Sequence, residues 1–406
     1  MARKTDVIII GGGAAGFFAA INLAESRKDL SVTILEKANK VLQKVRISGG
    51  GRCNVTHACF DPKDLVTYYP RGHRELLGPF HRFMTGDTFE WFSKRGIELK
   101  VEEDLRVFPL SDNSQTIIDC LVSGAETSGV NVLLNQNVSR IEKSKDKFEI
   151  ETNTETYLAD QLLVTTGGNP KMWDLLRALG HHIIDPVPSL FTFNITDELL
   201  RDLPGISVPN ATVSVQNGRY ESSGPLLITH WGISGPAVLT VSSFAAVALA
   251  AVHHKFSVTV NWLSSTFPET LEVLKRQKHI SSKKNIILKA PFPEIPKRLW
   301  EKMLIAAEIE SDLNWSDVSF KQLERLSNIL TSTEMLTHGK TTFKEEFVTA
   351  GGVDLKEVNF KRFESKLIPG LFFAGEVLNI DGVTGGFNFQ NAWTGGYIAG
   401  SSMADI

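Results

Sequence analysis

The sequence Gly11-Gly12-Gly13-Ala14-Ala15-Gly16, near the start of the chain, is its most informative segment. It follows the apolar run Asp6 to Ile10, which predicts a buried parallel strand. It opens the segment Ala14 to Ser26, where apolar residues recur at helical spacing. Ser31 to Glu36 has the pattern of a second strand. This order of strand, glycine turn, helix and strand is typical of a βαβ unit.

Each glycine of this G-x-G-x-x-G pattern has its own physical task. Gly11 permits the tight turn, Gly13 lets the backbone approach a pyrophosphate, and Gly16 lets the helix pack closely on the strand. The helix N-terminus directs free N–H groups and a positive dipole end toward the anion. Glu36, twenty residues after Gly16, is placed to accept hydrogen bonds from a ribose diol. The pattern therefore predicts dinucleotide binding, and FAD and NAD both fit it.

The C-terminal segment favours FAD over NAD. Leu371 to Glu376 is an apolar strand that ends in a glycine and an acid, and three glycines between 382 and 386 precede a helix starting near Phe387. A second glycine-rich strand–turn–helix at the far end of the chain suits a long, extended cofactor. Glu376 would hold a ribityl hydroxyl, and the backbone amides after Thr384 would meet the flavin pyrimidine edge.

A third glycine cluster, Ser48 to Asn54, lies soon after the predicted ribose-binding acid. Its three consecutive glycines could form a backbone nest for an anion, with Arg52 as a paired charge. Cys53 and Cys59 raise a different possibility, a flavin-linked disulfide reductase with a redox-active cysteine pair. Their C-x5-C spacing departs from the usual C-x4-C, so this alternative ranks lower.

Composition indicates a globular protein, with 42% hydrophobic and 22% charged residues among 406. The formal net charge of −3 gives no polyanion-binding signature, so we expect no nucleic-acid partner. Ala237 to Val252 is too short for a membrane span and is expected to be a buried helix, so we expect no membrane association. Three cysteines and the absence of a secretory pattern after Met1 predict a cytoplasmic location. No cluster of histidines, cysteines and acids predicts a metal site.

Five separated motifs resemble those of the bacterial BaiN/YhiN-like flavoproteins, which are NAD(P)/FAD-dependent oxidoreductases. The motifs are Ile47–Asn54, Arg106–Pro109, Thr229–Pro236, Thr349–Val353 and Ala374–Gln390. The resemblance covers nearly the whole chain. It implies an FAD domain, an inserted β-barrel-like domain and a small helical domain.

This chain departs from the family pattern at three positions near the expected flavin. His57 stands where an Asn is usual, and Asn379 and Asn391 replace an expected Asp and an aromatic residue. These departures bear on the substrate rather than on the cofactor.

The predicted fold class is α/β, with a discontinuous Rossmann-like, glutathione-reductase-like FAD-binding domain over 1–188 and 342–406. A β-rich substrate domain is predicted over 189–266 and 331–341, and a helical subdomain over 267–330. Within the first domain, Arg74 to Arg95 is expected to be one helix with an aromatic stripe. The predicted cofactor-binding residues are Gly11, Gly13, Ala14, Ala15, Gly16, Glu36, Lys37, Lys44, Ser48, Gly49, Gly50, Gly51, Arg52, Cys53, Asn54, Val138, Thr166, Gly167, Gly168, Gly375, Glu376, Gly385, Gly386, Phe387, Asn388 and Gln390.

The predicted function is an FAD-dependent oxidoreductase that acts on a small organic molecule. The flavin would be reduced by transiently bound NAD(P)H, as in an enone or C=C reductase, or by the substrate, as in an amine oxidase that uses oxygen. A non-enzymatic FAD-binding accessory protein is a further alternative. His230, in the turn-rich segment before Gly232, is the candidate for proton transfer. The oligomeric state is left open.

Overall fold

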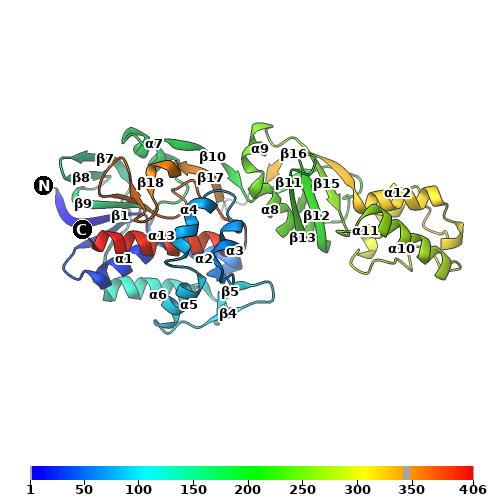
Figure 1. The fold of residues 1–406 in the computed structure, drawn as a ribbon, viewed down its shortest axis with the longest axis horizontal. Helices are drawn as coiled ribbons and strands as arrows, with labels where there is room; N and C mark the ends of the chain where they lie inside the picture. The colour runs from blue at the N-terminus through cyan, green and yellow to red at the C-terminus, as the bar shows by residue number, and fades with distance from the viewer. Residues whose placement is uncertain (1, 342–347, 406) are drawn as a thin grey trace. The chain divides into compact units, whose positions relative to one another are not determined.

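The computed structural model describes residues 2–341 and 348–405. The chain divides into two compact units, 1–187 with 344–406 and 188–343. The first is an α/β unit built from both ends of the chain, and the second is inserted between them (Figure 1). The predicted fold class, a discontinuous Rossmann-like domain with an inserted barrel and helices, is confirmed.

A parallel sheet forms the centre of the first unit. Its strands are ordered β20-β9-β1-β2-β6, and every neighbouring pair is parallel. The predicted strand around Asp6–Ile10 is the central strand β1, which is buried because helices and strands cover it on both faces. The strand bounds are β1 Arg3–Ile10, β2 Val32–Leu35, β6 Asn131–Leu133, β9 Thr156–Val164 and β20 Leu371–Phe373.

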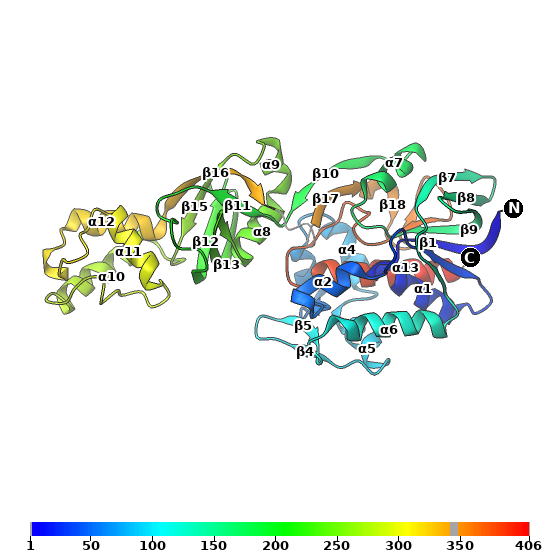
Figure 2. The ribbon, with the colours of Figure 1, turned by 180° about the vertical axis from the view of Figure 1, so that it is seen from behind.

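Helices cover one side of this sheet, and a hairpin extends it. Figures 1 and 2 both show helices α1 (Ala14–Ser26), α6 (Ser114–Thr127) and α13 (Phe387–Ala404) on one side of β1 and β9. The hairpin of β7 (Val138–Ser144) and β8 (Lys147–Thr152) extends the sheet, because β8 pairs antiparallel with the first half of β9. Because β1, β9 and β20 are parallel neighbours, the turns that follow them lie together at one edge of the sheet.

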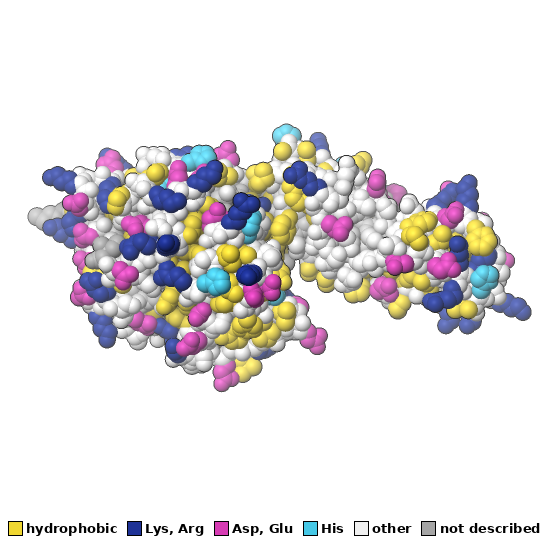
Figure 3. Space-filling view, viewed as in Figure 1, with side chains coloured by type: hydrophobic (Ala, Val, Ile, Leu, Met, Phe, Trp, Pro, Cys, Tyr) yellow, Lys and Arg dark blue, Asp and Glu magenta, His cyan; other side chains and the backbone are white. Residues whose placement is uncertain are grey.

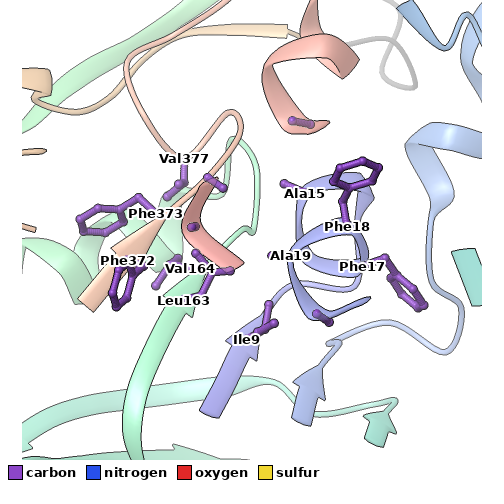
Figure 4. Close-up of a cluster of buried hydrophobic side chains, with 14 of the residues drawn as sticks. Ile9, Ala15, Phe17, Phe18, Ala19, Leu163, Val164, Phe372, Phe373 and Val377 are labelled. Atoms are coloured by element: carbon purple, nitrogen blue, oxygen red, sulfur yellow. The ribbon is translucent and has the colours of Figure 1, made fainter. Parts of the chain in front are cut away.

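Helices α1 and α13 approach each other closely through small residues. A Cβ on Gly396 would lie 2.7 Å from the carbonyl oxygen of Ala15, and one on Gly400 would lie 2.6 Å from that of Ala19. Because both contacts advance by four residues, the two helices run in the same direction. Phe18 and the strand residues Ile9 and Val164 belong to the core around this contact (Figure 4).

Two expectations about local structure were wrong. Residues 74–95 form two helices, α4 (His73–Phe80) and α5 (Thr85–Ser93). Pro79, which lacks a backbone N–H, lies in the last turn of the first helix, and the Asp87 carboxylate accepts from the Met84 N–H at 2.8 Å at the start of the second. Residues 237–252, expected to be one buried helix, divide into α8 (Pro236–Phe244) and α9 (Ala246–Ala251).

The second unit contains a closed six-stranded barrel in the order β11-β14-β13-β12-β15-β16. Its interior is filled by alternating apolar residues such as Val213, Val258 and Val260, and α8 packs against β12 and β13. The strand bounds are β11 Thr192–Ile195, β12 Ser207–Val215, β13 Tyr220–Thr229, β14 Gly232–Ser234, β15 Ser257–Asn261 and β16 Thr333–Thr341.

Three helices are inserted between β15 and β16. They are α10 (Phe267–Ile280), α11 (Lys297–Ala306) and α12 (Phe320–Thr331), and they pack around the buried Trp300 and Trp315. Among the described helices of the chain, none has the length and hydropathy needed to cross a lipid bilayer.

The contact between α1 and α13 makes a prediction about stability. Gly396→Ala should destabilise the protein by about 1–3 kcal/mol, because its methyl group must push two helix backbones apart. Gly78→Ala in α4 is the matched control, since nothing lies within 4 Å of its added Cβ and alanine favours the helix. Calorimetric unfolding of the purified proteins measures both. An unfolding temperature for Gly396→Ala at or above that of the control would contradict the packing account.

Candidate functional site

The turn after β1 has the geometry that its glycines predict. Gly11 has φ +113°, and a Cβ there would lie 2.7 Å from the carbonyl oxygen of Thr165. A Cβ on Gly16 would lie 2.1 Å from the carbonyl oxygen of Gly11, so only glycine permits this approach of helix and strand. Gly13, in contrast, has no atom within 4 Å of an added Cβ. The open space over Gly13 fits the approach of a pyrophosphate to the backbone.

A residue that the sequence did not point to holds this turn in place. The hydroxyl of Thr165, directly after β9, donates to the carbonyl oxygens of Ile10 (3.1 Å) and Gly11 (2.9 Å). The next residue, Thr166, was predicted to bind the cofactor, and its buried hydroxyl has no hydrogen-bond partner among the described residues. A buried hydroxyl without a protein partner is costly, so it fits a site that a bound group completes.

Glu36 lies at the end of β2, where the sequence places the ribose-binding acid. Its carboxylate accepts hydrogen bonds from the backbone N–H groups of Gly12 and Ala38, each at 2.8 Å. These bonds orient the carboxylate beside the glycine turn and leave lone pairs for a ribose diol. Lys37 follows it on the surface, and the N–H of Gln136, two residues before Val138, donates to the Glu36 carbonyl.

The third glycine cluster lies at the end of α2 (Gln43–Gly51), where the backbone of Ser48, Gly49 and Gly50 is not helical. Gly49, Gly50 and Gly51 all have positive φ, at 57°, 69° and 84°. Phe108 crowds the first of them, but nothing lies within 4 Å of a Cβ on Gly50 or Gly51. The cluster therefore presents an open backbone surface, as an anion nest requires.

The side chains of the two residues that follow these glycines make contacts within the protein. Arg52 bonds to Glu102 at 2.6 Å and to Asp112 at 3.4 Å, and its guanidinium lies over the ring of Phe108. Its charge is therefore already paired, which leaves the glycine amides as the candidate contacts for an anion. Cys53 is fully buried, and desolvation raises the pKa of its thiol to about 12. Such a thiol is not a thiolate at neutral pH, which opposes the disulfide-reductase alternative.

The end of β20 brings three predicted residues together. Lys44 Nζ lies 2.5 Å from Glu376 Oε2, and a Cβ on Gly167 would lie 3.4 Å from the same oxygen. Gly375, before the acid, has φ +76°. Gly168 is held close to Thr349, where its added Cβ would lie 2.8 Å from the hydroxyl. Segments from three parts of the sequence thus meet at Glu376.

The side chains at the start of α13 build the turn rather than face outward. Asn388 donates to the carbonyl of Gly382 and accepts from its N–H, at 2.9 and 2.8 Å. Gln390 is fully buried and accepts from Thr56 (2.6 Å) and Thr88 (3.0 Å). No described side chain caps this helix N-terminus. Its first-turn N–H groups are the part of the segment that can meet a cofactor.

Asn54 and Gly386 join the N-terminal and C-terminal segments. With its amide oriented to satisfy all its partners, Asn54 accepts from the Gly386 N–H at 3.0 Å and donates to the carbonyls of Val107 and Thr56. A Cβ on Gly386 would lie 2.5 Å from the Thr56 carbonyl oxygen. The second glycine turn is therefore fixed against the residues that follow the third glycine cluster.

An aromatic stack lies beside that turn. The rings of His57 and Tyr68 are stacked on Phe387, with centroids 4.6 and 4.3 Å away. His57 is buried, and its Nδ1 has no partner among the described residues. Burial lowers the pKa of its imidazole below the ordinary value near 6.5, against a smaller opposing influence of Asp104. His57 is therefore a neutral polar group at neutral pH, as the Asn usual at this position in the family would be.

The other two departures from the family pattern also lie near this turn in sequence. Asn391 is fully buried, and neither polar atom of its side chain has a partner among the described residues. The same holds for Oδ1 of Asn379. These atoms fit a site in which a bound group supplies the missing hydrogen bonds. His230 is exposed in the turn between β13 and β14, in the other compact unit. Its catalytic role stays a prediction.

These features define a class of protein. An FAD-binding oxidoreductase combines a Rossmann βαβ unit, a second helix N-terminus from the far end of the chain and a glycine cluster with open backbone between them. Residues 5–402 match the family model described as HI0933-like protein Rossmann domain. The chain belongs to this HI0933-like, BaiN/YhiN-like flavoprotein family.

Three relatives match over almost their whole length. A ribosomal RNA dihydrouridine synthase of Haemophilus influenzae is 31% identical, with 100% of each chain covered. Its namesake in Escherichia coli is 30% identical, covering 99% of this chain and 98% of the relative. A 3-dehydro-bile acid delta(4,6)-reductase of Clostridium scindens is 29% identical over 98% of both chains.

Solved structures share the fold. A 3-ketosteroid-delta4-(5alpha)-dehydrogenase from Rhodococcus jostii has a TM-score of 0.52 at 14% identity, covering 99% of this chain and 97% of its own. The open form of a flavocytochrome c3 fumarate reductase has a TM-score of 0.51 at 16% identity, covering 99% and 78%.

The open space over Gly13 leads to a prediction about FAD binding. Gly13→Val should lose most bound FAD, because the side chain fills the space that the pyrophosphate needs. The variant should still fold, since Gly13 has φ −97° and ψ −170°, which any residue adopts. Gly86→Val in α5 controls for adding a valine at an open glycine. Flavin absorbance per protein measures the effect. A folded Gly13→Val protein with full flavin content would contradict the assignment of this turn.

The lowered pKa of His57 predicts how the stability of the protein depends on pH. Because its pKa is lower in the folded protein than in the unfolded chain, the unfolded chain binds the proton more readily below pH 6.5. Stability should therefore be unaffected above that value and fall as the pH drops through the folded pKa. His57→Asn should lose less stability than the wild type between pH 7.5 and about 5. Thermal unfolding of both proteins across this range is the measurement, and identical pH profiles would exclude His57 as a contributor.

Proposed function

We propose that this FAD-dependent oxidoreductase reduces a carbon–carbon double bond conjugated to a carbonyl. The observation that carries the proposal is the chemistry shared by its full-length relatives. Dihydrouridine differs from uridine by saturation of the bond conjugated to the ring carbonyl, and a delta(4,6) 3-oxo steroid offers the same kind of bond. The feature common to the two kinds of substrate is the conjugated carbonyl, which a site of this family would recognise.

The residues of this chain suit such a reduction. FAD held at the Gly11–Gly16 turn and at Glu36 would supply a hydride for the β carbon of the double bond, once reduced by NAD(P)H. The uncapped N-terminus of α13 would stabilise negative charge on the bound flavin. A proton must also reach the α carbon, and His230 remains our candidate donor on chemical grounds. NAD(P)H is proposed as a transient donor, since the sequence offers no second dinucleotide fingerprint.

We further propose that the double bond belongs to a uridine in RNA. Two full-length relatives carry that activity in their names, at slightly higher identity than the bile acid reductase. This proposal replaces our expectation of no nucleic-acid partner, which rested on the net charge of the whole chain. A small enone, as in the bile acid reductase, is the second candidate substrate.

Anaerobic mixing tests the proposal. NADPH or NADH should bleach the flavin, and ribosomal RNA from a strain lacking this gene should restore its yellow colour. Mass spectrometry of the digested RNA should then show a uridine heavier by two hydrogen atoms. Gly13→Val protein without FAD is the control for adventitious reduction.

The alternatives give different results. Recovery of colour by a 3-oxo-delta4 steroid but not by RNA would support the small-enone substrate. Bleaching by amines alone, with peroxide formed on admitting air, would identify an amine oxidase. A flavin that no donor reduces would leave the accessory-protein alternative.

A further inference from the structure

One segment of the helical insert between β15 and β16 is rich in positive charge. Residues 275–289 contain six lysines and arginines and no aspartate or glutamate, whereas the whole chain has a net charge of −3. This run covers the C-terminal half of α10 and the segment after it. Figure 3 shows Lys and Arg side chains over the helical insert, together with apolar and some acidic side chains. A run of cations without an acid, on a protein whose net charge is −3, points to an anionic partner.

Four of these cations remain available to a partner. Arg276, Lys283, Lys284 and Lys289 are exposed and form no ion pair within the described part of the chain. Lys278 is different, because its Nζ donates to the carbonyls of Trp315, Ser316 and Val318, at 3.2, 2.6 and 2.6 Å. The side chain of Lys278 therefore holds the helices together, whereas the side chains of those four cations form no ion pair with described residues.

The segment that presents these cations is fixed in place. The backbone N–H of the buried Trp315 donates to the Lys284 carbonyl (3.1 Å), and its indole N–H donates to the Lys289 carbonyl (3.3 Å). Gln277 of α10 also donates to the Lys289 carbonyl. The spacing of the cations is thus set by packing and hydrogen bonds rather than by a flexible loop.

A groove beside the cations contains an exposed aromatic ring. It has a volume of about 570 Å³ and is lined by Glu272, Val273, Lys275, Arg276, His279 and Phe320. Phe320, the first residue of α12, is 57% exposed. Glu272 lies 3.9 Å from Lys275, so this carboxylate is compensated within the groove. An aromatic face next to a guanidinium and an imidazole suits a planar base.

We propose that this basic surface, made of Arg276, Lys283, Lys284, Lys289 and Phe320, binds a strand of RNA. The four cations contact backbone phosphates, and a base stacks on Phe320 in the groove. The choice of RNA as the polyanion rests on the proposed function. That this surface binds a polyanion is inferred from its charge and shape alone.

A phospholipid membrane is the competing partner for cations mixed with apolar side chains. Ile280 and Leu288, at 69% and 70% exposed, would suit a bilayer as well as ribose and bases. The groove favours RNA over a membrane, because a concave site with an aromatic ring accepts a base, whereas a flat bilayer would not fill it.

Fluorescence anisotropy of the FAD-loaded protein with a labelled RNA hairpin that has a uridine loop tests the surface. Arg276→Glu/Lys283→Glu/Lys284→Glu should weaken binding at least tenfold and reduce the slope of log affinity against log salt by about 2. Phe320→Ala should weaken it about 5- to 100-fold with an unchanged salt slope. Lys28→Glu/Lys63→Glu/Lys361→Glu, which changes the net charge equally at exposed positions of the other unit, should bind as wild type.

Three results would overturn the proposal. They are a wild-type protein that does not bind the hairpin, a triple variant of the basic surface that binds it normally, and an equal loss in the charge-matched control. Binding of phosphatidylglycerol vesicles but not of the hairpin would assign the surface to a membrane instead.

The same variants separate this surface from the proposed reaction. All should keep full FAD content and wild-type rates of flavin reduction by NADPH. Hairpin binding through the surface without any dihydrouridine formation would contradict the proposed function and leave the surface intact. Normal dihydrouridine formation by the triple variant would contradict the surface and leave the function intact.

Discussion

The site depends on the backbone contact between α1 and α13. Gly396 and Gly400 allow the last helix of the chain to lie against Ala15 and Ala19 of the first, with both helices running the same way. Residue 387, where α13 begins, precedes Gly396 by nine residues, or about 13 Å of helix. The two helix N-termini are therefore staggered along one direction. A dinucleotide that places its pyrophosphate at α1 and its ring at α13 must be extended, as FAD is when it spans two such ends.

This arrangement explains why the cofactor domain is discontinuous. One helix N-terminus comes from the first βαβ unit and the other from the last strand and helix. The insert therefore divides the cofactor domain in sequence but does not divide the cofactor site. Lys44 at Glu376 and Asn54 at Gly386 are further links between the two ends. A ligand bound to both ends stabilises the native state by mass action, and it also holds the two segments in register.

The glycine roles could be predicted from the sequence because they depend on local geometry. Gly11, Gly13 and Gly16 have the turn, the open space and the close packing that their spacing implies. Roles that depend on distant partners could not be predicted. The sequence does not reveal that Glu102 and Asp112 pair with Arg52, or that Gln390 bonds to Thr56 and Thr88. The net charge also hides how charge is distributed, because a total of −3 includes residues 275–289, which have six lysines and arginines and no acid.

We expect one FAD to be held by the N-termini of α1 and α13 together, and a crystal structure of the FAD-loaded protein would test this. The pyrophosphate oxygens should lie within hydrogen-bond distance of the amides at Gly13 to Ala15, with the pyrimidine edge against the first turn of α13. The adenine ribose should bond to Glu36. An FAD whose flavin ring lies away from the start of α13, with the pyrophosphate still at α1, would contradict the claim.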